Sequence, residues 1–137
     1  MTAARETLPA QEFGPFPMEA LVRYAAVSGD DNPLHLDPAI ARAAGLAAPP
    51  VHGMLMMSCF EPALASWRPD LRIARLSGKF LRPVLAGEKI VISGRIVQKG
   101  DGSDSKITLR LMAHISANGS GRDLAILAEA VLSPSLP

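Results

Sequence analysis

The sequence predicts an α+β fold in which an antiparallel β-sheet wraps around a buried helix. The first half of the chain has the periodicity of helices, and the segment 52–67 is apolar nearly all the way round, as in a helix buried on most sides. The second half has the pattern of four consecutive strands, at 71–82, 88–98, 106–117 and 124–132. Helices followed by a run of strands are typical of α+β domains.

Bulk properties limit the class of protein. A chain of 137 residues is long enough for one domain with its own core, and we expect a single domain over residues 1–137. The net charge of +1, without a basic run, argues against a nucleic-acid or membrane partner. The single cysteine, Cys59, rules out an internal disulfide and fits a reducing compartment. Because neither a secretory signal nor a span-length apolar run is recognisable, we expect a cytoplasmic protein.

Local signals place the elements of the first half. Residues 6–16, punctuated by Pro and Gly, could hold one short edge strand. A helix is expected from Pro17, a tolerated first-turn proline, to the stop at Gly29. A second, short helix should start at Asp37, a plausible N-cap, and end at Gly45.

The apolar helix 52–67 contains two residues that disturb it. Pro62 removes a backbone hydrogen bond, so we expect a kink or break near Phe60–Glu61. Gly53, near the start, leaves the backbone there unobstructed by a side chain. The many methionines and few aromatic residues are compatible with an adaptable apolar cavity, although ordinary core filling explains the same composition.

The strands of the second half should be joined by hairpin-like turns into an antiparallel sheet. Alternation is clearest over 106–117, and turn sequences occur at 99–105 and at 118–121. A single sheet of this size has edges to protect, and pairing of two subunits is one common solution.

A polar loop, SGDDNPLHLDP, interrupts the helical half between Ser28 and Pro38. Asp30 and His35 are five residues apart with Pro33 between them, so a tight turn could bring the carboxylate and the imidazole towards one point. Such a pair can hold and activate water. Turns favour Asp and Asn in any case, so a purely structural loop is an alternative. A metal site of Asp30, His35, Asp37 and His52 is a third option, but its spacing matches no familiar ligand pattern, and we expect no metal.

The run Y-x3-SGD-x-NP-x-H-x-D, from Tyr24 to Asp37, is followed by VHGM at Val51–Met54 and by FLRPVLAGE at Phe80–Glu88. In this order the three segments resemble the MaoC-like (R)-specific enoyl-CoA hydratases, also called hydratase 2, which have the hot-dog fold. The resemblance extends from about Met18 to Leu132.

The resemblance implies an enzyme, a hydro-lyase of fatty acid metabolism. It would hydrate a trans-2-enoyl-CoA to the (R)-3-hydroxyacyl-CoA, or catalyse the reverse dehydration. Asp30 and His35 would be catalytic, and Asn32 and Gly53 would be substrate-binding residues. Asn32 would support the loop geometry, and the Gly53 N–H would receive the thioester carbonyl. No metal or redox cofactor is implied. Coenzyme A would be part of the substrate and not a cofactor.

Further expectations concern the group that carries the acyl chain and the oligomeric state of the protein. The substrate would be an acyl-CoA or an acyl-carrier-protein thioester, and the protein a homodimer or a dimer of dimers. Four cations could meet the phosphates of coenzyme A or simply be solvated: Arg68, Arg72, Lys79 and Arg82. His52 is expected to anchor the start of the buried helix, and Tyr24 to pack.

Two alternatives stay open at this point. A hot-dog thioesterase would generally place its carboxylate on the central helix, where Glu61 is the only acidic residue and sits beside a proline. A non-catalytic acyl-thioester-binding subunit would keep the fold without the chemistry. The presence of both Asp30 and His35 disfavours each of them.

Overall fold

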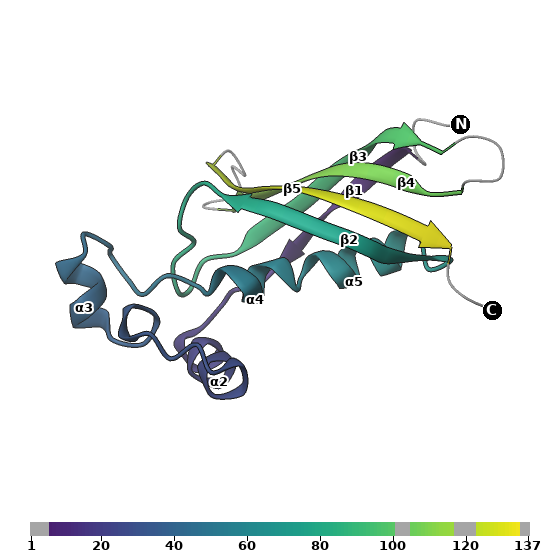
Figure 1. Cartoon of the computed structure of the whole chain (residues 1–137). Coiled ribbons are helices and arrows are strands. Elements are labelled where there is room, and N and C mark those ends of the chain that lie inside the picture. The colour runs from purple at the N-terminus through teal and green to yellow at the C-terminus, as the bar shows by residue number, and fades with distance from the viewer. Residues whose placement is uncertain (1–5, 101–104, 117–122, 135–137) are drawn as a thin grey trace.

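A computed structural model describes residues 6–100, 105–116 and 123–134. Its centre is one antiparallel sheet in the order β1-β3-β4-β5-β2, which curves over a helical layer (Figure 1). The strands are β1 (Thr7–Phe13), β2 (Leu71–Phe80), β3 (Ile90–Lys99), β4 (Ile107–Ile115) and β5 (Asp123–Pro134). This arrangement confirms the α+β prediction and the hot-dog fold. It also confirms that the first strand lies at an edge of the sheet.

The predicted long central helix is present as two segments under the sheet, α4 (Gly53–Met57) and α5 (Phe60–Trp67). Pro62 explains the interruption, because it has no N–H to donate to the carbonyl of residue 58 and its ring crowds that carbonyl. The break therefore lies at Ser58–Cys59, slightly before the predicted position at Phe60–Glu61, and Pro62 occupies the first turn of α5.

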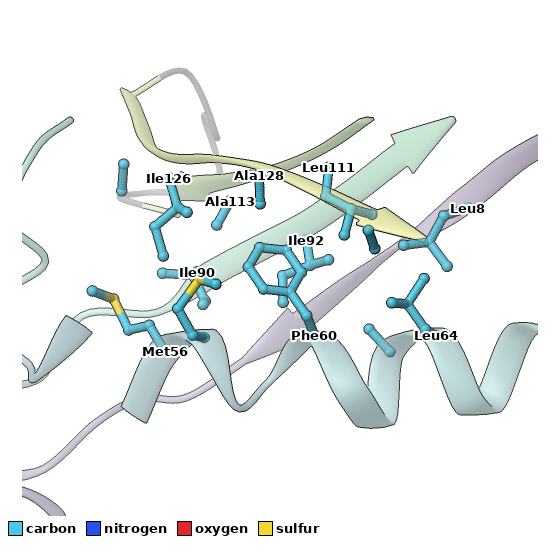
Figure 2. Close-up of a cluster of buried hydrophobic side chains, with 14 of the residues drawn as sticks. Leu8, Met56, Phe60, Leu64, Ile90, Ile92, Leu111, Ala113, Ile126 and Ala128 are labelled. Carbon is cyan, nitrogen blue, oxygen red and sulfur yellow. The ribbon is translucent and has the colours of Figure 1, made fainter. Parts of the chain in front are cut away.

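The core fills the space between these helices and the concave face of the sheet. The Phe60 side chain is fully buried and points from α5 toward the sheet (Figure 2). Alternate residues of the central strands meet it, including Ile92 of β3, Leu111 of β4 and Ile126 of β5. The two-residue periodicity seen in the sequence thus corresponds to one buried face.

A helical arm lies beyond one end of the sheet (Figure 1). It consists of α2 (Met18–Ser28), the 3-10 turn η1 (Pro33–His35) and α3 (Pro38–Ala43). Gly29 ends α2 with φ 81°, and Asp37 caps α3 by accepting the Ala39 N–H at 2.9 Å, both as predicted.

The arm returns to the sheet through Pro50 and Val51. Pro50 forms an isolated bridge with Leu85, and the Val51 N–H donates to the Val84 carbonyl at 2.7 Å. The VHGM segment is thereby fixed beside FLRPVLAGE, which places two of the three family-like motifs next to each other.

Two predictions from the sequence concern turns. The turn at 118–121 lies outside the described residues, as does most of the turn at 99–105. Among the helices that the structure does describe, none is long and apolar enough to cross a membrane.

Candidate active site

The polar loop folds through its own side chains. The Asn32 Oδ1 accepts the Leu34 N–H at 3.0 Å and so caps η1, while the Asp30 N–H donates to the Ser28 Oγ at 3.1 Å. Asn32 therefore has the turn-forming role expected of it. It does not line the pocket described below, so its predicted contact with substrate stays a prediction.

The turn brings Asp30 and His35 together. The Asp30 Oδ2 lies 3.9 Å from the His35 Nε2, too far for a direct hydrogen bond but near enough for both atoms to contact one water. The His35 Nδ1 lies 2.8 Å from the Pro50 carbonyl oxygen. Because a carbonyl only accepts, Nδ1 carries a proton, and Nε2 is the ring nitrogen that faces Asp30.

His52 is buried behind this pair, with a side chain that is 1% exposed. Its Nε2–H donates to the Asp30 carbonyl at 3.1 Å, and its ring stacks on His35 with centroids 4.0 Å apart. Tyr24 packs against its other side at 4.8 Å. His52 is the N-cap residue of α4, where the sequence placed it, and its carbonyl accepts the Leu55 N–H at 3.1 Å. Its side chain contacts the loop in addition.

Burial lowers the pKa of His52 below 6.5, and the neighbouring His35 lowers it further, although the hydrogen bond to Asp30 acts in the opposite direction. His52 is therefore neutral near pH 7. With Nε2 protonated, its Nδ1 carries the lone pair, and this buried atom has no hydrogen-bond partner among the described residues.

A pocket of about 460 Å³ opens beside Asp30. Gly53, the first residue of α4, contributes to its wall, and the exposed ring of Phe80 covers Gly53. A Cβ added at Gly53 would lie 2.7 Å from the Phe80 Cζ, so the ring occupies space that a glycine leaves open. The lining residues are Asp30, Pro50, Val51, Gly53, Met54, Met56, Phe80, Leu81, Arg82 and Pro83.

The sequence predicted three of the pocket residues as candidates, Asp30, Gly53 and Arg82, and placed His35 next to Asp30. It missed Pro50, whose carbonyl orients His35, and Phe80. The only signal for Phe80 was its position at the start of FLRPVLAGE. Contacts between segments so far apart in the sequence leave no local pattern.

The other charged candidates have different positions. Arg82 lines the pocket, while Arg68 forms a two-point ion pair with Asp70, at 2.9 and 2.8 Å. Glu61 is exposed and lies outside the described pocket lining, as does Asp31, the acidic residue next to Asp30.

Asp30, His35 and His52 could in principle hold a metal ion, because ligand atoms of all three lie within 4.8 Å of one another. The two imidazoles are stacked at an interplanar angle of 19°, so their in-plane lone pairs run side by side instead of converging. The His52 Nε2 is also engaged by the Asp30 carbonyl. The cluster is therefore better suited to holding water and moving protons than to tetrahedral metal coordination.

Comparisons with known proteins identify the family of this chain. The chain is 34% identical to the (R)-specific enoyl-CoA hydratase of Aeromonas caviae, over 80% of this chain and 79% of that one. A solved structure of the (R)-hydratase from A. caviae superposes with a TM-score of 0.81 at 28% identity, covering 95% of this chain and 97% of that one.

A second relative is the mitochondrial 3-hydroxyacyl-[acyl-carrier-protein] dehydratase of Arabidopsis thaliana, 41% identical over 56% of this chain. The aligned part spans only 46% of that longer protein. Residues 4–117 match the MaoC-like domain, which is the greater part of the sequence. On this match, and on the shared fold, the chain belongs to the family of MaoC-like dehydratase domains.

Proposed function

We propose that this protein is a hydro-lyase that adds water to a trans-2-enoyl thioester to give the (R)-3-hydroxyacyl thioester, or catalyses the reverse dehydration. The observation that carries the proposal is the 3.9 Å approach of the Asp30 carboxylate to the His35 Nε2 at the edge of the pocket. The names of the relatives, hydratases and dehydratases of acyl thioesters, support the same reaction class.

The chemistry needs one water and a pair that exchanges protons. Water held between Asp30 and His35 would attack C3 of the enoyl group, forming the C–O bond as one O–H bond breaks. The pair would receive that proton and return one to C2, so no net proton is gained or lost. Addition of both groups from the side on which the pair lies gives syn addition, and the (R)-product requires that the enoyl group binds with the corresponding face of C3 toward the pair.

Negative charge that develops on the thioester oxygen needs a hydrogen-bond donor. Gly53 lines the pocket together with Asp30, and its N–H belongs to the first turn of a helix, where N–H groups have no intrahelical partner. We propose that this N–H receives the thioester carbonyl. The apolar lining, including Met54 and Met56, would accept the acyl chain.

The acyl group of the substrate is linked as a thioester to coenzyme A or to the phosphopantetheine of a carrier protein. No metal or redox cofactor takes part in the proposed steps. Arg82, on the pocket wall, is the candidate for contact with a phosphate. A hot-dog thioesterase is less compatible with the site, because the carboxylate that lines the pocket is Asp30, whereas Glu61 on the central helix is exposed.

The test is the loss of enoyl-thioester absorbance when the purified protein meets crotonyl-CoA, with chiral analysis of the product. Asp30→Asn and His35→Ala should each lower kcat by at least about 100-fold while staying folded, because each removes one member of the proton-exchanging pair. Asp31→Asn is the matched control: it removes the adjacent carboxylate, which lies outside the pocket, and should leave kcat unchanged.

Three outcomes would change the proposal. Activity on crotonyl-carrier protein alone would identify a carrier-protein dehydratase. Full activity in the Asp30→Asn variant would reject the assignment of the pair. No turnover of short, medium or branched enoyl thioesters on either handle would leave a binding subunit as the explanation.

A further inference from the structure

His52 connects the two residues of the proposed catalytic pair by two different contacts. Its Nε2–H donates to the main-chain carbonyl of Asp30 at 3.1 Å, and the flat face of its ring lies against His35 at 4.0 Å and 19°. His52 is 1% exposed and is not among the described residues that line the pocket, although Val51 and Gly53 on either side of it are. Any effect of His52 on the reaction must therefore pass through these neighbours.

The two contacts restrain different degrees of freedom. The hydrogen bond fixes the Asp30 backbone, which otherwise belongs to an exposed loop held mainly by local turns. The stack prevents the His35 ring from tilting away from Asp30, and the Pro50 carbonyl prevents it from rotating. Tyr24, tilted against the far side of His52, supports the ring from α2. The separation of 3.9 Å thus depends on a side chain from a third segment.

We propose that His52 is a positioning residue that holds Asp30 and His35 at the distance needed to share one water. This inference rests on the proposed function. A positioning role can be distinguished from a purely structural role, because it predicts that a change of His52 lowers kcat independently of any effect on stability.

The chemistry of histidine suits this position. A single planar side chain must supply a donor at one edge and a flat face for stacking, and it must remain uncharged beside His35. The charged or titratable groups that face it are the His35 ring, the Asp30 carboxylate and the Tyr24 ring; His35 and Asp30 have opposite effects on its pKa. Phe reproduces the flat face without the donor, and Gln reproduces the donor at the Nε2 position without the ring.

The experiment compares His52→Phe and His52→Gln with the wild type, with kcat and KM measured per folded molecule. We expect His52→Phe to lower kcat by on the order of 10- to 100-fold with KM within about twofold, because misplacement of catalytic groups acts on the chemical step. His52→Gln should recover at least part of that loss. Leu64→Ala, equally buried but on α5 and distant from the loop, is the control: it should lower the melting temperature without lowering kcat per folded molecule.

A His52→Phe variant with wild-type kcat, or a His52→Gln variant no better than His52→Phe, overturns the proposal. A second readout does not depend on activity. NMR should find His52 protonated at Nε2 and His35 at Nδ1, and the Asp31 amide, which donates to the Gly29 carbonyl at 3.1 Å, should exchange faster in His52→Phe than in His52→Gln. If the wild type hydrates no enoyl thioester, the proposed function fails, and these NMR results alone decide whether His52 holds the loop.

Discussion

Gly53 and Phe80 meet at the pocket although they belong to different segments of the chain. The Phe80 Cζ lies 2.7 Å from where a Gly53 Cβ would stand, and the ring is 52% exposed. Any side chain at residue 53 must therefore displace the ring, and the displaced ring must move within the pocket that receives the substrate. The site therefore depends on the space that glycine leaves at residue 53, because that space holds the Phe80 ring.

Gly53→Ala should lower kcat/KM by on the order of 10- to 100-fold, because the methyl group and the displaced ring intrude where the thioester must lie. Stability should change by less than about 1 kcal/mol, since the clash is with the free end of a side chain and Ala favours the helix. Steady-state kinetics and urea unfolding measure the two effects. In Gly53→Ala/Phe80→Ala the loss should be smaller than the product of the single effects; a simple product would contradict the contact.

The buried His52 should also make the stability depend on pH. Its pKa is lower in the folded protein than in the unfolded chain, so between these two values the unfolded state binds more protons. Its contribution to the free energy of unfolding is therefore complete above the ordinary pKa of 6.5 and decreases as the pH falls, by at most about 1.4 kcal/mol per pH unit.

Urea unfolding at about pH 7.5 and about pH 5.5, on either side of the ordinary histidine value, measures this dependence. The decrease at the lower pH should be smaller in His52→Phe than in the wild type. His114→Phe, on a strand, is the comparison that should keep the wild-type dependence. If the free energy of unfolding of His52→Phe had the same pH dependence as that of the wild type, His52 would not be its cause.

Elements were the level at which the sequence was most informative. The strand at Ile107–Ile115 was predicted because it has one buried face, which imposes a two-residue period on its sequence. The strand at Leu71–Phe80 has only half-buried and exposed residues, and its period in the sequence is correspondingly weak. The break in the central helix was also predictable, since Pro62 acts on a carbonyl at a fixed distance along the chain. The Asp30–His52 and Gly53–Phe80 contacts were not predictable, because they depend on how separate elements pack.

Gly94, in the middle of β3, has less room for a Cβ than Gly78, the other glycine of the described strands. A Cβ there would lie 2.6 Å from the Leu111 Cδ2 and 2.7 Å from the Arg110 carbonyl oxygen, and the second of these is backbone and cannot move alone. Gly94→Ala should therefore lower the free energy of unfolding by about 1–3 kcal/mol. Ser93→Ala, next to it on the opposite face, should change it by no more than about 0.5 kcal/mol. Chemical denaturation measures both, and equal values would argue against the crowding.

The whole molecule has open edges and exposed apolar side chains. Strands β1 and β2 each pair on one side only among the described strands, and Met54, Phe80 and Leu81 are more than half exposed around the pocket. We propose, as the sequence suggested, that two copies associate, because unpaired edges and apolar surface are commonly covered in this way.

Light scattering after size-exclusion chromatography should give twice the 14.5 kDa of one chain, or four times that value for a dimer of dimers. Activity should fall with the dimer population on dilution, since apolar side chains at the pocket would lose their cover. A particle of 14.5 kDa that is fully active would refute the proposal.

The strand order also has a consequence for how the protein folds. Strands β3, β4 and β5 are neighbours in sequence and in space, whereas residue 7 pairs with residue 95 and residue 80 with residue 126. Closing these long loops is slow compared with forming the meander, so we expect the meander to form early and the two edges to dock late. Phe80 reaches Gly53 only when β2 has docked on β5. Strand β5, which is synthesised after β2, therefore contributes no residue to the described pocket lining and yet determines when the pocket forms.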